Sequence, residues 1–133
     1  MLTLISFDSI VMTNFIKKIM FGTLNNEEIE QVFHNNIIGR IGCHADGKTY
    51  VVPISYGYDG KCIYAHTYEG LKISIMRKNP EVCFQVDSMQ NMANWQSVIA
   101  WGTFEELTDP KTRINGLTKL TDRVLPYIAS ETV

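Results

Sequence analysis

The strongest pattern in the chain begins at Ile37, where apolar and polar residues start to alternate. Ile37–Ala45, Thr49–Tyr58 and Lys61–His66 are rich in β-branched and aromatic residues and are separated by Asp46-Gly47 and Asp59-Gly60. An Asp-Gly pair between two such runs is a strong signal for a tight β-hairpin. The pattern therefore predicts three antiparallel strands arranged as a meander.

Two further strands are predicted after residue 80. In Glu81–Asp87 every second side chain is apolar, and Trp95–Leu107 is the longest run of this kind. The side chains expected to face the interior are Val82, Phe84, Val86, Val98, Ala100 and Phe104. Five strands with one helix between the third and fourth predict a mainly β protein, an antiparallel β-barrel with added helices, because closing a sheet removes its exposed edges.

Three segments have helical spacing. The first follows Asn25, which stands three residues before Glu28 as in a capping box, and it presents Ile29, Val32 and Phe33 on one face. The second, Glu69–Lys78, is expected to bury Leu71, Ile75 and Met76 and to end before Pro80. The third follows Thr108-Asp109-Pro110 and is expected to end at Pro126, with an apolar side made of Ile114, Leu117, Leu120 and Val124.

Length and charge exclude several protein classes. The 133 residues suit one domain, which we expect over 21–133, preceded by a poorly packed N-terminal arm over 1–20 with Met12 as an alternative start. Asp8 inside the apolar run and the lysines after it do not fit a secretory signal. A net charge of −2 creates no field that would recruit nucleic acid or an anionic membrane, and three scattered cysteines favour a reducing cytoplasm.

Strand alternation predicts an aromatic outer surface. If Ile63 and Ala65 face the interior, Tyr64 and His66 face outward, as do Trp95 and Trp101 on the last strand. Exposed aromatic patches usually mark a ligand or a partner. The alternative is that these are separate aromatic residues covered by the N-terminal arm or by a helix.

The stretch from Tyr64 to Lys72 predicts an anion site. It runs from a strand into the first turn of a helix, where backbone N–H groups are available, and it carries Thr67, Gly70 and Lys72. We expect a phosphate here, most simply that of a flavin. A metal site is rejected, because Cys62 and His66 lie about 13 Å apart along one strand.

Five motifs occur in the order and spacing of a known family. They are Gly39-Arg40-Ile41-Gly42; Asp46-Gly47-Lys48 followed by Tyr50–Tyr56; Tyr64, His66, Gly70 and Lys72; Asn79-Pro80 with Val82-Cys83-Phe84; and Trp95, Ser97, Val98 and Gly102. Over residues 25–125 the chain resembles the pyridoxamine 5′-phosphate oxidase-like FMN-binding split barrels. It is most similar to the branch that contains the nitroimidazole-resistance (Nim) proteins.

The resemblance implies a homodimer with FMN in a groove between the two subunits. Carried over by position, the cofactor-binding residues are Val52, Pro53, Ile54, Ser55, His66, Thr67, Gly70, Lys72, Gln85, Trp95 and Ser97, with Trp95 and Ser97 coming from the facing subunit. His66 is the candidate catalytic residue. The resemblance thus implies an FMN-dependent oxidoreductase acting on a small molecule, with nitroimidazole-type compounds as candidate substrates.

Two departures from the family limit this interpretation. No arginine-containing segment follows the last helix, which argues against vitamin B6 oxidation, and no further strand follows it to close the barrel. Two other classes therefore stay open: a flavin-binding carrier or sensor without turnover, and a dimeric interaction protein whose flavin groove has decayed.

Overall fold

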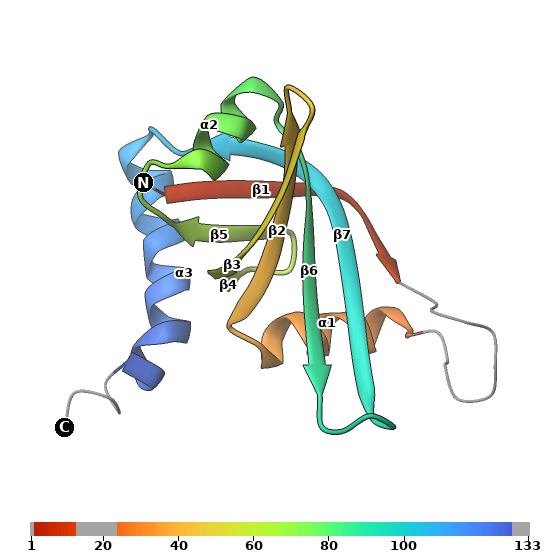
Figure 1. The fold of residues 1–133 in the computed structure, drawn as a ribbon. Helices are drawn as coiled ribbons and strands as arrows, with labels where there is room; N and C mark the ends of the chain where they lie inside the picture. The colour runs from red at the N-terminus through yellow and green to blue at the C-terminus, as the bar shows by residue number, and fades with distance from the viewer. Residues whose placement is uncertain (1, 13–23, 129–133) are drawn as a thin grey trace.

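The computed structural model describes residues 2–12 and 24–128. The elements follow one another as β1 (Leu2–Met12), α1 (Asn26–Asn35), β2 (Ile38–Ala45), β3 (Lys48–Ser55), β4 (Gly57–Tyr58), β5 (Cys62–His66), α2 (Leu71–Lys78), β6 (Glu81–Met89), β7 (Trp95–Glu106) and α3 (Pro110–Ile128) (Figure 1). The strands form one sheet in the order β3-β2-β6-β7-β1-β5-β4, and every neighbouring pair is antiparallel.

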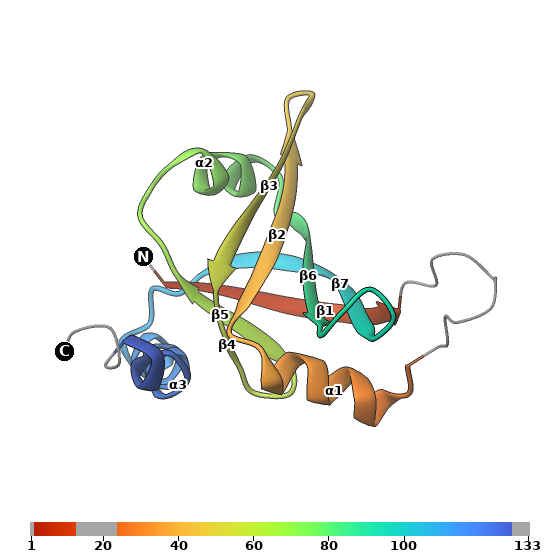
Figure 2. The ribbon, with the colours of Figure 1, turned by 60° about the horizontal axis from the view of Figure 1, so that its bottom comes forward.

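The sheet curls so that its two ends meet. β3 and β4 are its edges, yet Tyr56 alone separates them in the chain. Figure 2 shows the long strands crossing at a steep angle around the interior, with α1 and α3 below them. The predicted antiparallel split barrel is confirmed, and the structural neighbours described below share it.

The predicted meander is wrong, although both of its turns are right. β2 and β3 form one hairpin through Asp46 and Gly47, which have φ angles of 53° and 75°. β4 and β5 form a second hairpin at the opposite end of the sheet. The chain leaves β3 at Tyr56, a fully buried residue whose backbone N–H bonds the carbonyl of Ile37, and so the expected strand Thr49–Tyr58 is two strands.

The N-terminal segment is the largest departure from prediction. Residues 2–12, expected to be part of a poorly packed arm, form β1 and lie between β7 and β5. This strand pairs with β5 over Leu2–Ser6 and with β7 over Thr3–Met12, and these distant partners leave no signal in the local pattern. β1 thereby joins the part of the sheet that contains β7 to the part that contains β5. Residues 13–20 lie outside the described residues, so the division into 1–20 and 21–133 stays a prediction.

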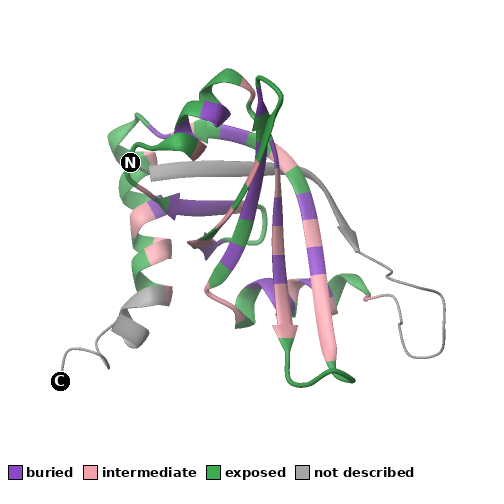
Figure 3. Cartoon of the chain, in the orientation of Figure 1, coloured by how far each residue is buried: buried purple, intermediate pink, exposed green. Residues whose placement is uncertain are grey.

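The core lies inside the curled sheet. Val82, Phe84 and Val86 of β6 and Val98, Ala100 and Phe104 of β7 are all buried, as predicted. Figure 3 shows this alternation as bands of buried and half-buried residues along β6 and β7. One face of each strand therefore fills the core, and the other face is left for contacts outside it.

All three predicted helices are present, but α2 begins later than predicted and the buried faces differ in part. Asn25 and Glu28 form the expected capping box of α1. In α2, Ile73 is buried while Leu71 is 45% exposed, because α2 starts two residues later than expected and Leu71 is its first residue. In α3, Ile114 is 65% exposed and the helix continues past Pro126 to Ile128; the side chain of Val124 lies outside the described residues. None of the described helices is long and apolar enough to cross a membrane.

Tyr64 does not belong to an exposed aromatic surface. It is only 5% exposed and packs in a small cluster with Leu107 and Leu117, the second of which comes from α3. Its hydroxyl donates to a carboxylate oxygen of Asp59 at 2.9 Å. Alternation correctly predicted that Tyr64 faces away from the barrel interior. Tyr64 is nevertheless buried, because α3 covers that side of β5.

Candidate functional site

The edge strand β3 carries four of the predicted site residues, and alternation splits them between its two faces. Val52 and Ile54 are half-buried and pack against the core, whereas Pro53 and Ser55 are exposed on the outer face. Pro53 has no N–H to give to a second neighbour, which suits an edge strand. Val52 and Ile54 form a partly covered apolar surface on the inner side of that edge.

The β5–α2 connection carries the predicted anion-binding residues. Gly70 is the N-cap residue of α2, and no side chain caps the first turn. A Cβ atom added at Gly70 would meet nothing within 4 Å, so the space beside this helix start is open. The first turn of α2 therefore presents backbone N–H groups and the positive end of the helix dipole to an open space.

Lys72 adds a positive charge to this helix start. It is half-buried, and its positive charge acts electrostatically on the Cys43 thiol of β2. Burial raises the pKa of Cys43, the thiol of Cys83 acts in the same direction, and Lys72 opposes them. Among the residues whose side chains the structure describes, no carboxylate lies within ion-pair distance of Lys72, although arginine and lysine form four ion pairs there. A half-buried cation without a carboxylate favours an anionic ligand.

Lys72 belongs to α2, which packs on β2, the strand next to β3. Cys43 is paired with Tyr50 of β3, and Tyr50 shares the inner face of that strand with Val52 and Ile54. The charge of Lys72 at Cys43 therefore acts next to the row Tyr50, Val52 and Ile54.

His66 and Thr67 lie where β5 ends. His66 is exposed, and its ring meets that of Tyr68 edge-on at 6.3 Å. Desolvation lowers the pKa of His66, and nearby positive charge, including that of Arg113, lowers it further. Thr67 is half-buried and donates a long hydrogen bond of 3.4 Å to the carbonyl of Tyr68. The imidazole is therefore held toward its neutral form, in which it can both donate and accept a hydrogen bond.

Gln85 and Ser97 belong to a different surface, the outer face of β2, β6 and β7. Gln85 donates to the hydroxyl of Ser97 at 2.9 Å and to the carboxylate of Asp87 at 3.3 Å. Arg40 forms an ion pair with the same Asp87 oxygen at 2.7 Å. The resemblance implies that Gln85 reaches the flavin groove from β6, and in this chain Gln85 hydrogen bonds Ser97, a residue expected to act from the facing subunit.

Trp95 is too far from the β5–α2 connection to share a site with it in one chain. His66 is paired with Leu2 of β1, and Thr3 is paired with Glu106 at the far end of β7. The path along β7 from Glu106 back to Trp95 is about 36 Å at 3.3 Å per residue. The predicted site residues thus form two sets, an edge set (Val52, Ile54, His66, Thr67, Gly70 and Lys72) and an outer set (Pro53, Ser55, Gln85, Trp95 and Ser97).

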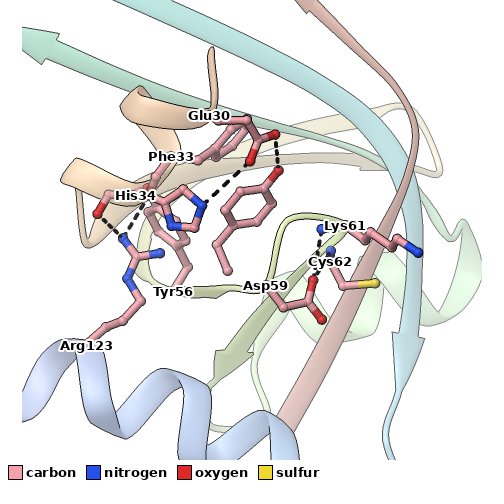
Figure 4. A network of polar contacts seen from close by, with 9 residues as sticks. Glu30, Phe33, His34, Tyr56, Asp59, Lys61, Cys62 and Arg123 are labelled. Atoms are coloured by element: carbon pink, nitrogen blue, oxygen red, sulfur yellow. Dashed lines mark hydrogen bonds and ion pairs between the residues drawn. The ribbon is translucent and has the colours of Figure 1, made fainter. Parts of the chain in front are cut away.

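A polar network missed by the sequence analysis fixes the point where β3 ends. Arg123 of α3 donates to the carbonyl oxygens of Phe33 at 2.8 Å, His34 at 3.1 Å and Asn36. Tyr56 donates to the same Phe33 carbonyl at 2.7 Å (Figure 4). Arg123, 67 positions after Tyr56 in the sequence, gave no local signal. The ion pair of Arg40 and Asp87 was missed too, although alternation places both on the outer face.

The chain was compared with protein families, curated proteins and solved structures. A family model described as pyridoxamine 5′-phosphate oxidase matches residues 25–132. An uncharacterised protein of Rhizobium meliloti (strain 1021) is 33% identical over 84 residues, which are 63% of this chain and 56% of that protein. The chain thus spans little more than half the length of this curated relative.

Two solved structures resemble the whole fold. An FAD-binding protein from Mesorhizobium loti matches with a TM-score of 0.69 and 33% identity, over 83% of this chain and 80% of that one. A candidate 5-nitroimidazole antibiotic resistance protein from Bacteroides thetaiotaomicron matches with a TM-score of 0.65 and 20% identity, over 90% of this chain and 73% of that one. At that identity the second likeness concerns the fold alone.

Proposed function

The chain belongs to the pyridoxamine 5′-phosphate oxidase family, and from this premise we propose that it binds a flavin through an FMN moiety. Lys72 is the observation that carries the proposal. It combines a half-buried positive charge, no carboxylate partner in the described chain and a position in the uncapped first turn of α2. A phosphate satisfies both the cation and the helix N–H groups.

The residues of the edge set fit the parts of FMN. Thr67, Gly70 and Lys72 would hold the phosphate, and the apolar side chains of Val52 and Ile54 would lie against the ring system. The similar FAD-binding protein from Mesorhizobium loti supports the flavin class. When bound, a flavin supplies one- and two-electron transfer chemistry.

We further propose that the outer set acts from a second copy of the chain. Besides Pro53, Ser55, Gln85, Trp95 and Ser97, the outer face exposes four large apolar side chains, which are Ile38, Val51, Met89 and Trp101. Val51 and Trp101 line the same pocket on this face, and exposed apolar surface of this kind supports a protein partner. A homodimer would cover it and could bring Trp95 and Ser97 of one subunit to the edge set of the other.

We also propose oxidoreductase activity, with nitroaromatic compounds as candidate substrates. It is supported by the motif order that resembles the nitroimidazole-resistance branch. His66, exposed at the end of β5 and held toward its neutral form, would contact a substrate and donate or accept a hydrogen bond. Without turnover, the same site would serve a flavin carrier or sensor.

Affinity for FMN and for riboflavin tests the phosphate site. We expect the purified protein to show an absorption band near ~450 nm after addition of FMN. Lys72→Ala should weaken FMN binding by about 1.5–3 kcal/mol, because one charge-assisted contact is lost, and should leave riboflavin binding unchanged. Lys78→Ala, at the other end of α2, is the matched control. Equal FMN affinity in wild type and Lys72→Ala would refute the phosphate assignment.

Turnover is tested under anaerobic conditions. NADH or NADPH should bleach the flavin band of the loaded protein, and a nitroimidazole should restore it. His66→Gln should slow the second step while leaving FMN affinity within about threefold. A flavin that neither nucleotide reduces would point to the carrier or sensor function instead.

A further inference from the structure

A cavity lies beside the start of α2, where the phosphate is proposed to bind. It lies between α2 and the β2–β3 hairpin and has a volume of about 230 Å³. Its lining residues are Ala45, Asp46, Lys48, Leu71, Ser74, Ile75 and Lys78. In Figures 1 and 2, α2 lies beside this hairpin. The cavity is smaller than the ~300–1,000 Å³ of a complete small-molecule site, and so it suits one part of a larger ligand.

The cavity begins where the phosphate site ends. Leu71, its first helical residue, lies between the N-cap residue Gly70 and Lys72. On β2, Ala45 lines the cavity and is two positions beyond Cys43, on the same face. Two residues of a strand span about 7 Å, so on β2 the cavity lies about one such span from Cys43, the thiol on which the charge of Lys72 acts.

The helix presents one continuous face to this cavity. Leu71, Ser74, Ile75 and Lys78 are spaced i, i+3, i+4 and i+7, the spacing of one side of a helix. They extend for about 10 Å along α2. That length accommodates a ribose and a purine end to end, starting from a phosphate at the first turn.

The lining has an apolar floor and a polar rim, and a ligand made of a ribose and a purine requires both. Ala45 and Ile75 are buried and form an apolar floor. Asp46 and Ser74 provide oxygen acceptors at the rim, and Lys78 holds the Asp46 carboxylate at 2.8 Å. An adenosine offers two apolar ring faces to the floor, and its amino and ribose hydroxyl groups can donate to the rim oxygens.

We propose that this cavity binds the adenosine half of FAD, so that FAD and not free FMN is the tighter ligand. The inference rests on the proposed flavin site and extends it along α2. The pyrophosphate would lie at the first turn with Lys72, and the adenosine would lie between α2 and the β2–β3 hairpin.

Dissociation constants of FAD, FMN and riboflavin for the flavin-free protein test the proposal. We expect wild type to bind FAD at least about tenfold more tightly than FMN. Ser74→Trp, which fills the cavity from an exposed helix position, should remove this difference and leave FMN within about twofold of wild type. Ser74→Ala leaves the cavity open and should keep the preference. Circular dichroism confirms that each variant is folded.

The outcomes separate this inference from the proposed function. Equal affinities of wild type for FAD and FMN would overturn the adenosine site and leave the flavin site standing. An undiminished FAD preference in folded Ser74→Trp would overturn it as well. No binding of any flavin would overturn both proposals.

Discussion

The guanidinium of Arg123 lies 4.8 Å from the ring centroid of Tyr56, and both side chains donate to the carbonyl oxygen of Phe33 (Figure 4). Three elements meet at this point: the C-terminal end of α1, the break between β3 and β4, and α3. The carbonyls at the end of α1 have no partners within the helix, and Arg123 supplies donors for them together with a positive charge. The contact therefore holds the end of β3, the strand that carries the proposed flavin surface.

Replacing Arg123 should destabilise the fold. Arg123→Ala removes the hydrogen bonds to Phe33, His34 and Asn36 and the stacking on Tyr56, and we expect the free energy of unfolding to fall by about 2–4 kcal/mol. Arg123→Lys should be intermediate, since an ammonium lacks the planar fork. Urea unfolding measures this. Arg113→Ala, at an exposed position of the same helix, should change stability by no more than about 0.5 kcal/mol. A variant Arg123→Ala as stable as this control would contradict the assigned role.

Tyr56 should make stability depend on alkaline pH. Burial raises the pKa of Tyr56 to about 12, with Arg123 opposing the shift. The neutral phenol is thus favoured in the folded state: the stabilisation is complete below pH ~10 and is lost as pH rises toward 12, on the order of 2–3 kcal/mol in total. Tyr58 and Tyr64 have raised pKa values as well and act with the same sign.

The slope of unfolding free energy against pH between 10 and 12 is the measurement. Tyr56→Phe removes one titrating group, so its slope should be smaller than that of wild type by up to ~1.4 kcal/mol per pH unit. Tyr68→Phe, at a position 87% exposed, is the control for replacing a tyrosine by phenylalanine. If Tyr56→Phe and wild type lose stability in parallel, the tyrosine is not the group responsible.

Local sequence patterns correctly predicted the features that depend on residues close together in the sequence. The Asp46-Gly47 turn, the capping box of Asn25 and Glu28 and the buried row on β6 each depend on residues a few positions apart. The break at Tyr56 depends on Phe33 and Arg123, which are 23 and 67 positions away. No alternation within Thr49–Tyr58 could reveal such partners, and the same holds for β1 and for the covering of Tyr64 by α3.

The candidate site was predictable to a similar extent. The residue types from His66 to Lys72 indicated an anion site at a helix start, and the helix does start at that place without a side-chain cap. Alternation alone could have separated Val52 and Ile54 from Pro53 and Ser55. The grouping of Gln85 with Ser97 required the register of β6 against β7, which sequence spacing does not supply.

Replacement by alanine should lower the stability of the fold at Gly57 and change it little at Gly70. A Cβ at Gly57 would lie 2.8 Å from the backbone nitrogen of Leu120 in α3, so Gly57→Ala must push the helix away and should cost about 1–3 kcal/mol of stability. A Cβ at Gly70 meets nothing within 4 Å, and Gly70→Ala should change stability by less than about 1 kcal/mol.

Flavin titration separates the two glycine variants further. If a phosphate approaches Gly70, Gly70→Ala should weaken FMN binding severalfold while its unfolding curve stays near that of wild type. Gly57→Ala should lose stability first and FMN affinity only as a consequence. Unchanged FMN affinity in Gly70→Ala would place the phosphate elsewhere on α2.

The division of the site residues into an edge set and an outer set predicts complementation between subunits. Lys72→Ala damages the edge set of its own chain, and Trp95→Ala damages the outer set that its chain offers to a partner. In a two-fold symmetric dimer a mixed pair then contains one site with both defects and one intact site. Random reassociation of equal amounts should restore tight FMN binding at about a quarter of all sites.

Lys72→Ala mixed with Thr67→Val should restore none, because both changes lie in the edge set. The measurement is a flavin titration of the co-refolded mixtures. Failure of the first pair to exceed its separate components would mean that the two sets do not meet across a dimer.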